Sequence, residues 1–307
     1  MKRQRGVALI IALLVVALSS LLVVALLDAG ELTQARVRNG WRAEQSLQLS
    51  RGLEAWAIAG LLADLRQTGA VDAPGEQWAQ PRPTITLPDA RIEGRLRDLG
   101  GCFNINSIAP DGHIDPLAMQ RLSRLVKALR LPDRLATRLA DYVDADRTTA
   151  QGSAEGGGSS ESRNPGGPLM DASELLHMPG MTAPEWRSLS GLLCATPVDQ
   201  PINLNTAPPA IWQALSNAID PEMAQRLART GVNPYSDITA VQAALQREGV
   251  TGVDLSGCGV GSRYFMAEAR IVLDDITFRR SMVLQRSPDT IRVIARMRGA
   301  PSHEVRP

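Results

Sequence analysis

The chain of 307 residues carries 33 Lys and Arg against 32 Asp and Glu, which leaves a formal net charge of +1. This balance argues against binding of nucleic acid or another polyanion as the main function. The length exceeds that of a typical domain, so we expect a membrane anchor plus two folded units. The three cysteines lie far apart without a CxxC pair, which argues against zinc and thioredoxin-like chemistry.

The N-terminus combines a short basic stretch with a long apolar segment. Lys2, Arg3 and Arg5 precede residues 7–27, which read VALIIALLVVALSSLLVVALL and contain no charge. About 20 such residues cross a bilayer as a helix, whereas a cleaved secretory signal has a shorter core that ends in small residues. The positive-inside bias keeps the basic residues in the cytoplasm. We therefore predict a single-pass anchor helix with the bulk of the chain outside the cytoplasm.

The helix is predicted to continue beyond the membrane to about residue 69. No proline occurs between Leu27 and Pro74, and apolar residues recur at every fourth position in the later part of this stretch. These residues are Leu49, Leu53, Ala57, Leu61 and Leu65. Such a stripe predicts that the second half of the helix packs on a soluble domain.

Alternating polarity predicts an antiparallel sheet. Residues 264–273, 276–285 and 291–297 alternate and are separated by short turns, and residues 91–99 read as a further strand. The last of the three segments is expected to direct four apolar residues to one face: Ile291, Val293, Ala295 and Met297.

Residues 110–249 show helical periodicity and hardly any strand signal. Capping residues mark several helix starts: Asp171 or Ser173 before Glu174, Thr182 before residues 184–193, Thr206 before Pro208, and Asp220 before Pro221. We predict an α+β fold in which a long helix packs on an antiparallel sheet and a large all-α domain is inserted. The predicted divisions are a leader 1–6, a helix 7–69 with its transmembrane part at 7–27, a first α/β part 70–109, the insert 110–249 and the C-terminal strands 250–307.

A basic leader that ends in Gly6, followed by an apolar segment and a continuing helix, resembles the N-terminus of type IV pilins and type II secretion pseudopilins. The resemblance implies a type IV pilin-like fold in the inner membrane, cleavage by a prepilin peptidase between Gly6 and Val7, and methylation of Val7. The fifth mature residue would be Ile11, where most pilins carry a glutamate. That carboxylate needs a partner in the bilayer, thought to be the N-terminus of a neighbour, so a subunit without it suits a terminal position.

Three further stretches resemble the type II secretion system protein K family, which is known to lack this glutamate. They are residues 101–106 (GCFNIN), 202–208 (INLNTAP) and 262–270 (SRYFMAEAR). The resemblance implies a minor pseudopilin that initiates or caps the tip of the periplasmic pseudopilus during export of folded proteins across the outer membrane. The implied partners are the minor pseudopilins I and J, the prepilin peptidase and the secreted substrate. A minor type IV pilin would share the anchor without explaining the insert.

Acidic residues flank a Gly- and Ser-rich loop in the insert. A hard cation, which takes six to eight oxygen ligands, would order such a loop. The resemblance to protein K implies calcium here, with Asp144, Asp146, Glu155 and Glu174 as ligands. The alternative is a solvated acidic helix end with a floppy loop.

Two of the cysteines, Cys102 and Cys194, each lie near an expected junction between sheet and insert. A disulfide between them would close a long loop and stabilise the attachment of the insert. Two reduced, buried cysteines are the alternative. Cys258 is then expected to be a free thiol.

A membrane-anchored DNA-binding or DNA-uptake protein is the competing hypothesis. Residues 203–207 (NLNTA) resemble the opening of helix-hairpin-helix modules, and residues 176–181 would form the hairpin. This hairpin lacks the Gly-x-Gly that brings backbone amides to a phosphate, and few basic residues lie nearby. The three histidines are scattered, and no GxSxG, P-loop or HExxH motif occurs. We therefore expect neither nucleic-acid binding nor enzymatic activity.

Overall fold

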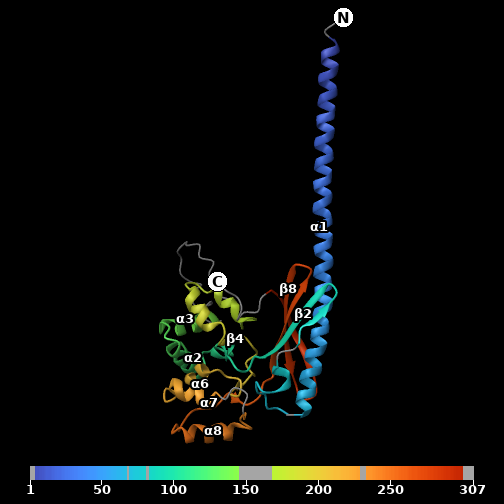
Figure 1. Ribbon diagram of the computed structural model, residues 1–307. Helices are drawn as coiled ribbons and strands as arrows, with labels where there is room; N and C mark the ends of the chain where they lie inside the picture. Colours follow the sequence, from blue (N-terminus) through green and yellow to red (C-terminus); the bar gives the residue numbers. More distant parts are fainter. Residues whose placement is uncertain (1–3, 68, 81–82, 145–167, 229–232, 300–307) are drawn as a thin grey trace, which may run out of the picture. The chain divides into compact units, whose positions relative to one another are not determined.

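The computed structural model describes residues 4–67, 69–80, 83–144, 168–228 and 233–299. The chain divides into two compact units, residues 1–51 and residues 52–307. One helix, α1 (Gln4–Gln67), supplies the first unit and the beginning of the second (Figure 1).

The first unit contains the apolar segment of α1. Within the described residues, α1 is the one helix long and apolar enough to cross a membrane, with a mean hydropathy of 3.1 in its most apolar window. None of that window is buried, as is expected of a segment that crosses a membrane. The helix runs without interruption from this segment into the amphipathic half, so the predicted continuous helix is confirmed.

The second unit contains a five-stranded antiparallel sheet with the strand order β1-β2-β7-β8-β9. The strands are β1 (Ile85–Leu87), β2 (Ala90–Asp98), β7 (Tyr264–Leu273), β8 (Ile276–Arg286) and β9 (Ile291–Arg298). Strand β2 and the meander β7-β8-β9 confirm the prediction, whereas the three-residue strand β1 was not predicted. Because β2 pairs with β7 along its whole length, the insert leaves the sheet and returns to it between two neighbouring strands.

The amphipathic end of α1 packs on one face of this sheet. Ala57 and Leu61, both 0% exposed, share an apolar cluster with Phe265 of β7. Trp78, in the short 3₁₀ helix η1 (Gln77–Ala79), lies edge-on to Phe265 with ring centroids 5.2 Å apart. The predicted apolar stripe on α1 is confirmed by the burial of its centre.

Strand β9 departs from the predicted alternation. Val293 lies opposite Leu284, whereas Ala295 lies opposite Val283, so Ile294 is an extra residue in a β-bulge. An added residue reverses which side chains share a face, and accordingly Val293 packs on the α1 side while Ala295 packs on the other. The prediction of one shared face is therefore wrong, because alternation alone carries no sign of a bulge.

The insert is helical, as predicted, and its core contains the fully buried Trp186 and Trp212. Within the described residues its helices are α2 (Pro116–Ala128), α3 (Arg134–Val143), η3 (Ala172–His177), α5 (Ala183–Leu189), α6 (Pro209–Leu215), α7 (Pro221–Leu227) and α8 (Ile238–Arg247). Thr182 caps α5 and Asp220 caps α7, which confirms both predicted caps.

Two predicted helices differ from the structure in detail. The segment that contains Glu174 is the 3₁₀ helix η3, capped by Asp171 rather than Ser173. Helix α5 ends at Leu189, before the predicted end at 193, because the chain turns there into the short strand β4 (Leu193–Cys194). Local sequence identifies helix starts better than helix ends, since capping residues mark the starts.

The core of the insert extends beyond the predicted boundaries of 110 and 249. Phe103 before the first boundary and Val250 after the second are buried in it. Two parallel pairs of two-residue strands contribute to these ends: β3 (Phe103–Asn104) with β4, and β5 (Ile202–Asn203) with β6 (Cys258–Gly259). Strands this short leave no periodic signal, so the sequence pattern does not reveal them. The 3₁₀ helix η2 (Ile105–Ile108) follows β3 directly.

Candidate functional site: the junction between sheet and insert

Two Asn-x-Asn motifs form equivalent turns, one after β3 and one after β5. In each, the backbone N–H of the second asparagine donates to Oδ1 of the first, from Asn106 to Asn104 at 3.2 Å and from Asn205 to Asn203 at 3.0 Å. The second asparagine then both accepts from and donates to the backbone of one remote residue in the insert. The asparagines in two of the stretches that resemble the protein K family, residues 101–106 and 202–208, therefore fix the backbone of the insert.

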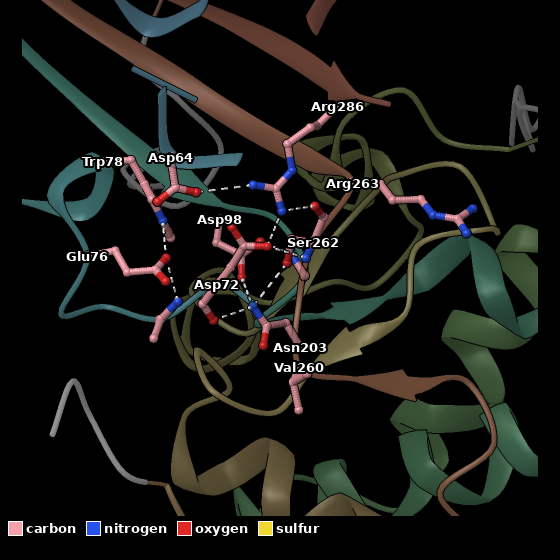
Figure 2. A network of polar contacts seen from close by, with 12 residues as sticks. Asp64, Asp72, Glu76, Trp78, Asp98, Asn203, Val260, Ser262, Arg263 and Arg286 are labelled. Atoms are coloured by element: carbon pink, nitrogen blue, oxygen red, sulfur yellow. Dashed lines mark hydrogen bonds and ion pairs between the residues drawn. The ribbon is translucent and has the colours of Figure 1, made fainter. Parts of the chain in front are cut away.

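Asn203 connects the insert to three parts of the sheet unit. Its side chain is buried, and Nδ2 contacts the carbonyl oxygen of Asp72 at 3.1 Å, Oδ2 of Asp98 at 3.0 Å and Oγ of Ser262 at 3.2 Å (Figure 2). These residues lie after α1, at the end of β2 and just before β7. One amide from the insert thus contacts three segments of the sheet unit.

Arg286, the last residue of β8, binds two acidic side chains at this junction. Its guanidinium donates to Oδ2 of Asp64 at 3.3 Å and to the carbonyl of Ser262 at 2.8 Å, and it also forms an ion pair with Asp72. The guanidinium carbon lies 4.8 Å from the centre of the Phe265 ring. Burial raises the pKa of Asp72 to about 7, and the charge of Arg286 opposes that shift.

Both carboxylate oxygens of Asp98 accept hydrogen bonds from uncharged donors. Its Oδ1 accepts from the backbone N–H of Gly100 at 2.6 Å, and its Oδ2 accepts from Asn203 and from the hydroxyl of Thr206. Thr206 was predicted to cap the following helix, and this prediction is wrong. The residue before α6 is Pro208, without a side-chain cap, because the Thr206 hydroxyl bonds across the junction instead.

Cys102 and Cys194 lie beside the junction and are joined in a disulfide, with Cα atoms 5.8 Å apart and a sequence separation of 92. The bond connects the first residues of the insert with strand β4. Cys258 is a free thiol, and burial raises its pKa to about 11.

The predicted calcium ligands are only partly placed by the structure. Asp146 and Glu155 lie outside the described residues. Asp144 follows the end of α3. Glu174 completes the capping box of η3 by accepting at Oε1 from the backbone N–H groups of Met170 and Asp171, at 2.7 and 2.9 Å. The ligand set therefore stays a prediction.

The predicted processing residues lie in the first turns of α1. Gly6 precedes the apolar segment, and Val7 and Ile11 are 57% and 55% exposed. Cleavage after Gly6 and methylation of Val7 stay predictions.

The segment that resembles a helix-hairpin-helix opening lies in the interior. Asn203 and Leu204 are 0% exposed, and Asn205 and Ala207 are nearly as buried. Their side chains serve the junction and the core of the insert, so these side chains are not available to nucleic acid.

The sequence analysis missed Asp64, Asp72 and Arg286. Arg286 follows Met282 and Leu284 at alternate positions, so the strand pattern places it on the buried face. A charge at an inward position is the signal of a buried ion pair. Asp64 lies three residues after the buried Leu61 and gives the same signal on α1.

A long N-terminal helix packed on an antiparallel sheet, with a helical domain inserted between two neighbouring strands, defines a type IV pilin-like protein with an all-α insert. The family model described as "Type II secretion system (T2SS), protein K" matches residues 101–198. The protein named type II secretion system protein K from Pseudomonas aeruginosa is 32% identical over 316 aligned residues, which cover 96% of this chain and 93% of that protein. The protein of the same name from Klebsiella pneumoniae is 29% identical and covers 97% of both chains. The chain belongs to the type II secretion system protein K family.

The fold of a solved structure is similar over most of the chain. A chain in the crystal structure of the GspK-GspI-GspJ complex from enterotoxigenic Escherichia coli matches with a TM-score of 0.70 and 25% identity. The match covers 86% of the present chain and 99% of that chain.

Proposed function

We propose that the protein is a minor pseudopilin that initiates or caps the tip of the periplasmic pseudopilus. The proposal rests on Ile11, which stands where most pilins carry a glutamate. A pilin glutamate at this position is stabilised in the bilayer by the charged N-terminus of a neighbour, and a subunit without it cannot take part in that pairing. The end of a filament is the position where the pairing is dispensable.

The helical insert supports the same position. It is attached to the sheet unit by the buried hydrogen bonds of Asn203 to Asp72 and Asp98, and the disulfide between Cys102 and Cys194 closes the insert beside this junction. A large domain fixed in this way would interrupt a continuous stack of subunits, whereas the last subunit has room for it.

The proposed partners are the minor pseudopilins I and J. The similar solved chain belongs to a complex with GspI and GspJ, and the similarity in fold makes these partners the first to test. We further propose anchoring in the inner membrane, with the bulk of the chain in the periplasm, after a prepilin peptidase has cut between Gly6 and Val7. At the tip, the insert would be free to meet secreted substrates.

Co-expression tests the partners. The full-length chain is expressed in membranes together with the minor pseudopilins I and J and purified in mild detergent. A complex of all three is expected. Failure of either partner to co-purify would contradict the assignment.

Substitution of Ile11 tests the tip position. Ile11→Glu places a carboxylate in the bilayer without a partner, at a cost of about 3 kcal/mol, and should lower both recovery of the complex and secretion. Ile11→Leu is the matched control and should leave both unchanged. A glutamate variant that assembles and secretes as well as the original chain would count against the assignment of this chain to the tip position.

Calcium in the insert remains part of the proposal, with Asp144, Asp146, Glu155 and Glu174 as ligands. Oxygen ligands on both sides of a Gly- and Ser-rich loop suit this hard cation. Removing calcium with a chelator should lower the melting temperature of the full-length chain, and Asp144→Asn should reduce that effect. An unchanged melting temperature would contradict the site.

A further inference from the structure

Three carboxylates converge beside Arg286. Asp64 belongs to α1, and Asp72 and Glu76 belong to the segment that follows it (Figure 2). One oxygen from each lies within 4.8 Å of the other two, and within the described residues no other three His, Cys, Asp or Glu side chains meet this condition. Calcium binds oxygen at about 2.3–2.6 Å, so oxygens around one ion lie at most about 5 Å apart. The three carboxylates therefore fit one ion.

Asp72 provides independent evidence for a missing ligand. The residue is 0% exposed, and its Oδ1 has no hydrogen-bond partner. Its Oδ2, in contrast, accepts from the backbone N–H of Ser262 at 2.7 Å and pairs with Arg286. A buried carboxylate oxygen without a partner is costly, and native proteins rarely leave one unpaired.

One guanidinium, that of Arg286, is shared between Asp64 and Asp72. Arg286 offsets one of the three negative charges, and a divalent cation would offset the other two. Asp98 adds a further negative charge nearby, although it bonds to neutral donors. A single proton on Asp72 would neutralise only one of these charges.

We propose that Asp64, Asp72 and Glu76 bind a divalent cation, with water completing its coordination. Calcium is favoured because every protein ligand is a carboxylate oxygen and because two of the three ligands, Asp72 and Glu76, come from irregular backbone after α1. The site differs from the calcium site proposed in the insert. It would tie the end of α1 to the segment that places Trp78 in the core beneath the helix.

Terbium luminescence tests this site directly, because Trp78 lies beside it. The indole Nε1 of Trp78 donates to Oε2 of Glu76 at 2.6 Å, so Trp78 is in position to sensitise a lanthanide bound by Glu76. Full-length chain in detergent, stripped with chelator, is titrated with Tb³⁺ under tryptophan excitation. We expect saturable luminescence that Ca²⁺ displaces and that falls at least tenfold in Trp78→Phe.

Two variants distinguish this site from the insert. Glu76→Gln should abolish the signal, whereas Asp144→Asn, the control in the insert, should retain it. Asp64→Asn serves as a second ligand variant if Glu76→Gln does not keep its circular dichroism spectrum. Luminescence that survives both ligand variants, or that disappears in Asp144→Asn, would overturn the proposal. So would the absence of any saturable signal.

Discussion

Arg286 and Asp72 form an ion pair across 214 residues of sequence, with side chains that are 5% and 0% exposed. Asp72 lies between the long helix and the sheet, and Arg286 ends the strand β8. The same Asp72 accepts at its carbonyl from Asn203 of the insert. This pair therefore joins the helix, the sheet and the insert at one buried point.

Loss of Arg286 should destabilise the protein strongly. Arg286→Met removes the cation and leaves Asp64 and Asp72 buried without it, and breaking a buried pair from one side costs about 3–5 kcal/mol. Chemical unfolding of the full-length chain in detergent measures this cost. Arg263→Met is the control: Arg263 pairs with Asp199 at the surface, where an ion pair contributes at most about 1 kcal/mol. Equal losses in the two variants would contradict the assigned role.

The capping box of α5 should make stability depend on pH. Burial acts to raise the pKa of Glu185, but hydrogen bonds from Thr182 and the charge of Arg138 outweigh it and hold the pKa below its ordinary value. A lowered folded-state pKa contributes stability above the unfolded pKa of about 4.3, and this contribution is lost as the pH falls through the folded-state pKa. Glu185→Gln should therefore unfold more easily than the original chain at pH 7, and the difference should shrink near pH 3.

Unfolding at a series of pH values checks this prediction. Glu222→Gln is the control, since Glu222 is an exposed first-turn residue of α7 without a capping role there. Its effect should be small at every pH. A difference for Glu185→Gln that stays constant from pH 7 to pH 3 would exclude the charge as its source.

The disulfide should survive purification and support the insert. Mass spectrometry without reduction should find Cys102 and Cys194 linked and Cys258 free. Cys102→Ser with Cys194→Ser should lower the free energy of unfolding by about 2–5 kcal/mol. Cys258→Ser is the matched control and should cost much less. Alkylation of all three cysteines without reductant would show that the bond is absent.

The helix and the meander were predictable because their signals are local. The apolar run at residues 7–27 and the alternation in β7 and β8 are patterns of neighbouring residues, and they identify the helix and the strands even though β7 is buried on both faces over residues 264–269. The caps Thr182 and Asp220 were equally predictable from the sequence, since the side chain of each accepts a hydrogen bond from a backbone N–H of its own helix. These features require no knowledge of the rest of the fold.

The junction was not predictable in the same way. Thr206 looks like a cap, yet its hydroxyl bonds to Asp98, 108 residues away. Asn203 belongs to a stretch that resembles the protein K family, but its three partners come from distant segments. The bulge at Ile294 likewise depends on how β9 pairs with β8. A polar residue with remote partners has no local periodicity, so only the inward charges Asp64 and Arg286 hint at the network.

Close backbone contact at the junction leads to the last prediction. A Cβ atom added to Gly261 would lie 1.8 Å from the carbonyl oxygen of Ala70, which is backbone and cannot turn aside. Gly261→Ala should therefore displace the segment that carries Ser262 away from Asp72. We expect a loss of several kcal/mol in unfolding free energy, in the range of severe core disruption.

Gly60 provides the opposite control within the same unit. It lies in α1, and a Cβ added there meets nothing within 4 Å. Because glycine costs about 1 kcal/mol relative to alanine inside a helix, Gly60→Ala should stabilise the chain by up to that amount. If Gly261→Ala lowers the unfolding free energy while Gly60→Ala raises it, the loss at Gly261 comes from the close contact at the junction and not from adding a methyl group in general. If Gly261→Ala were as stable as the original chain, the loop after α1 would have to lie farther from residues 259–262 than the structure places it.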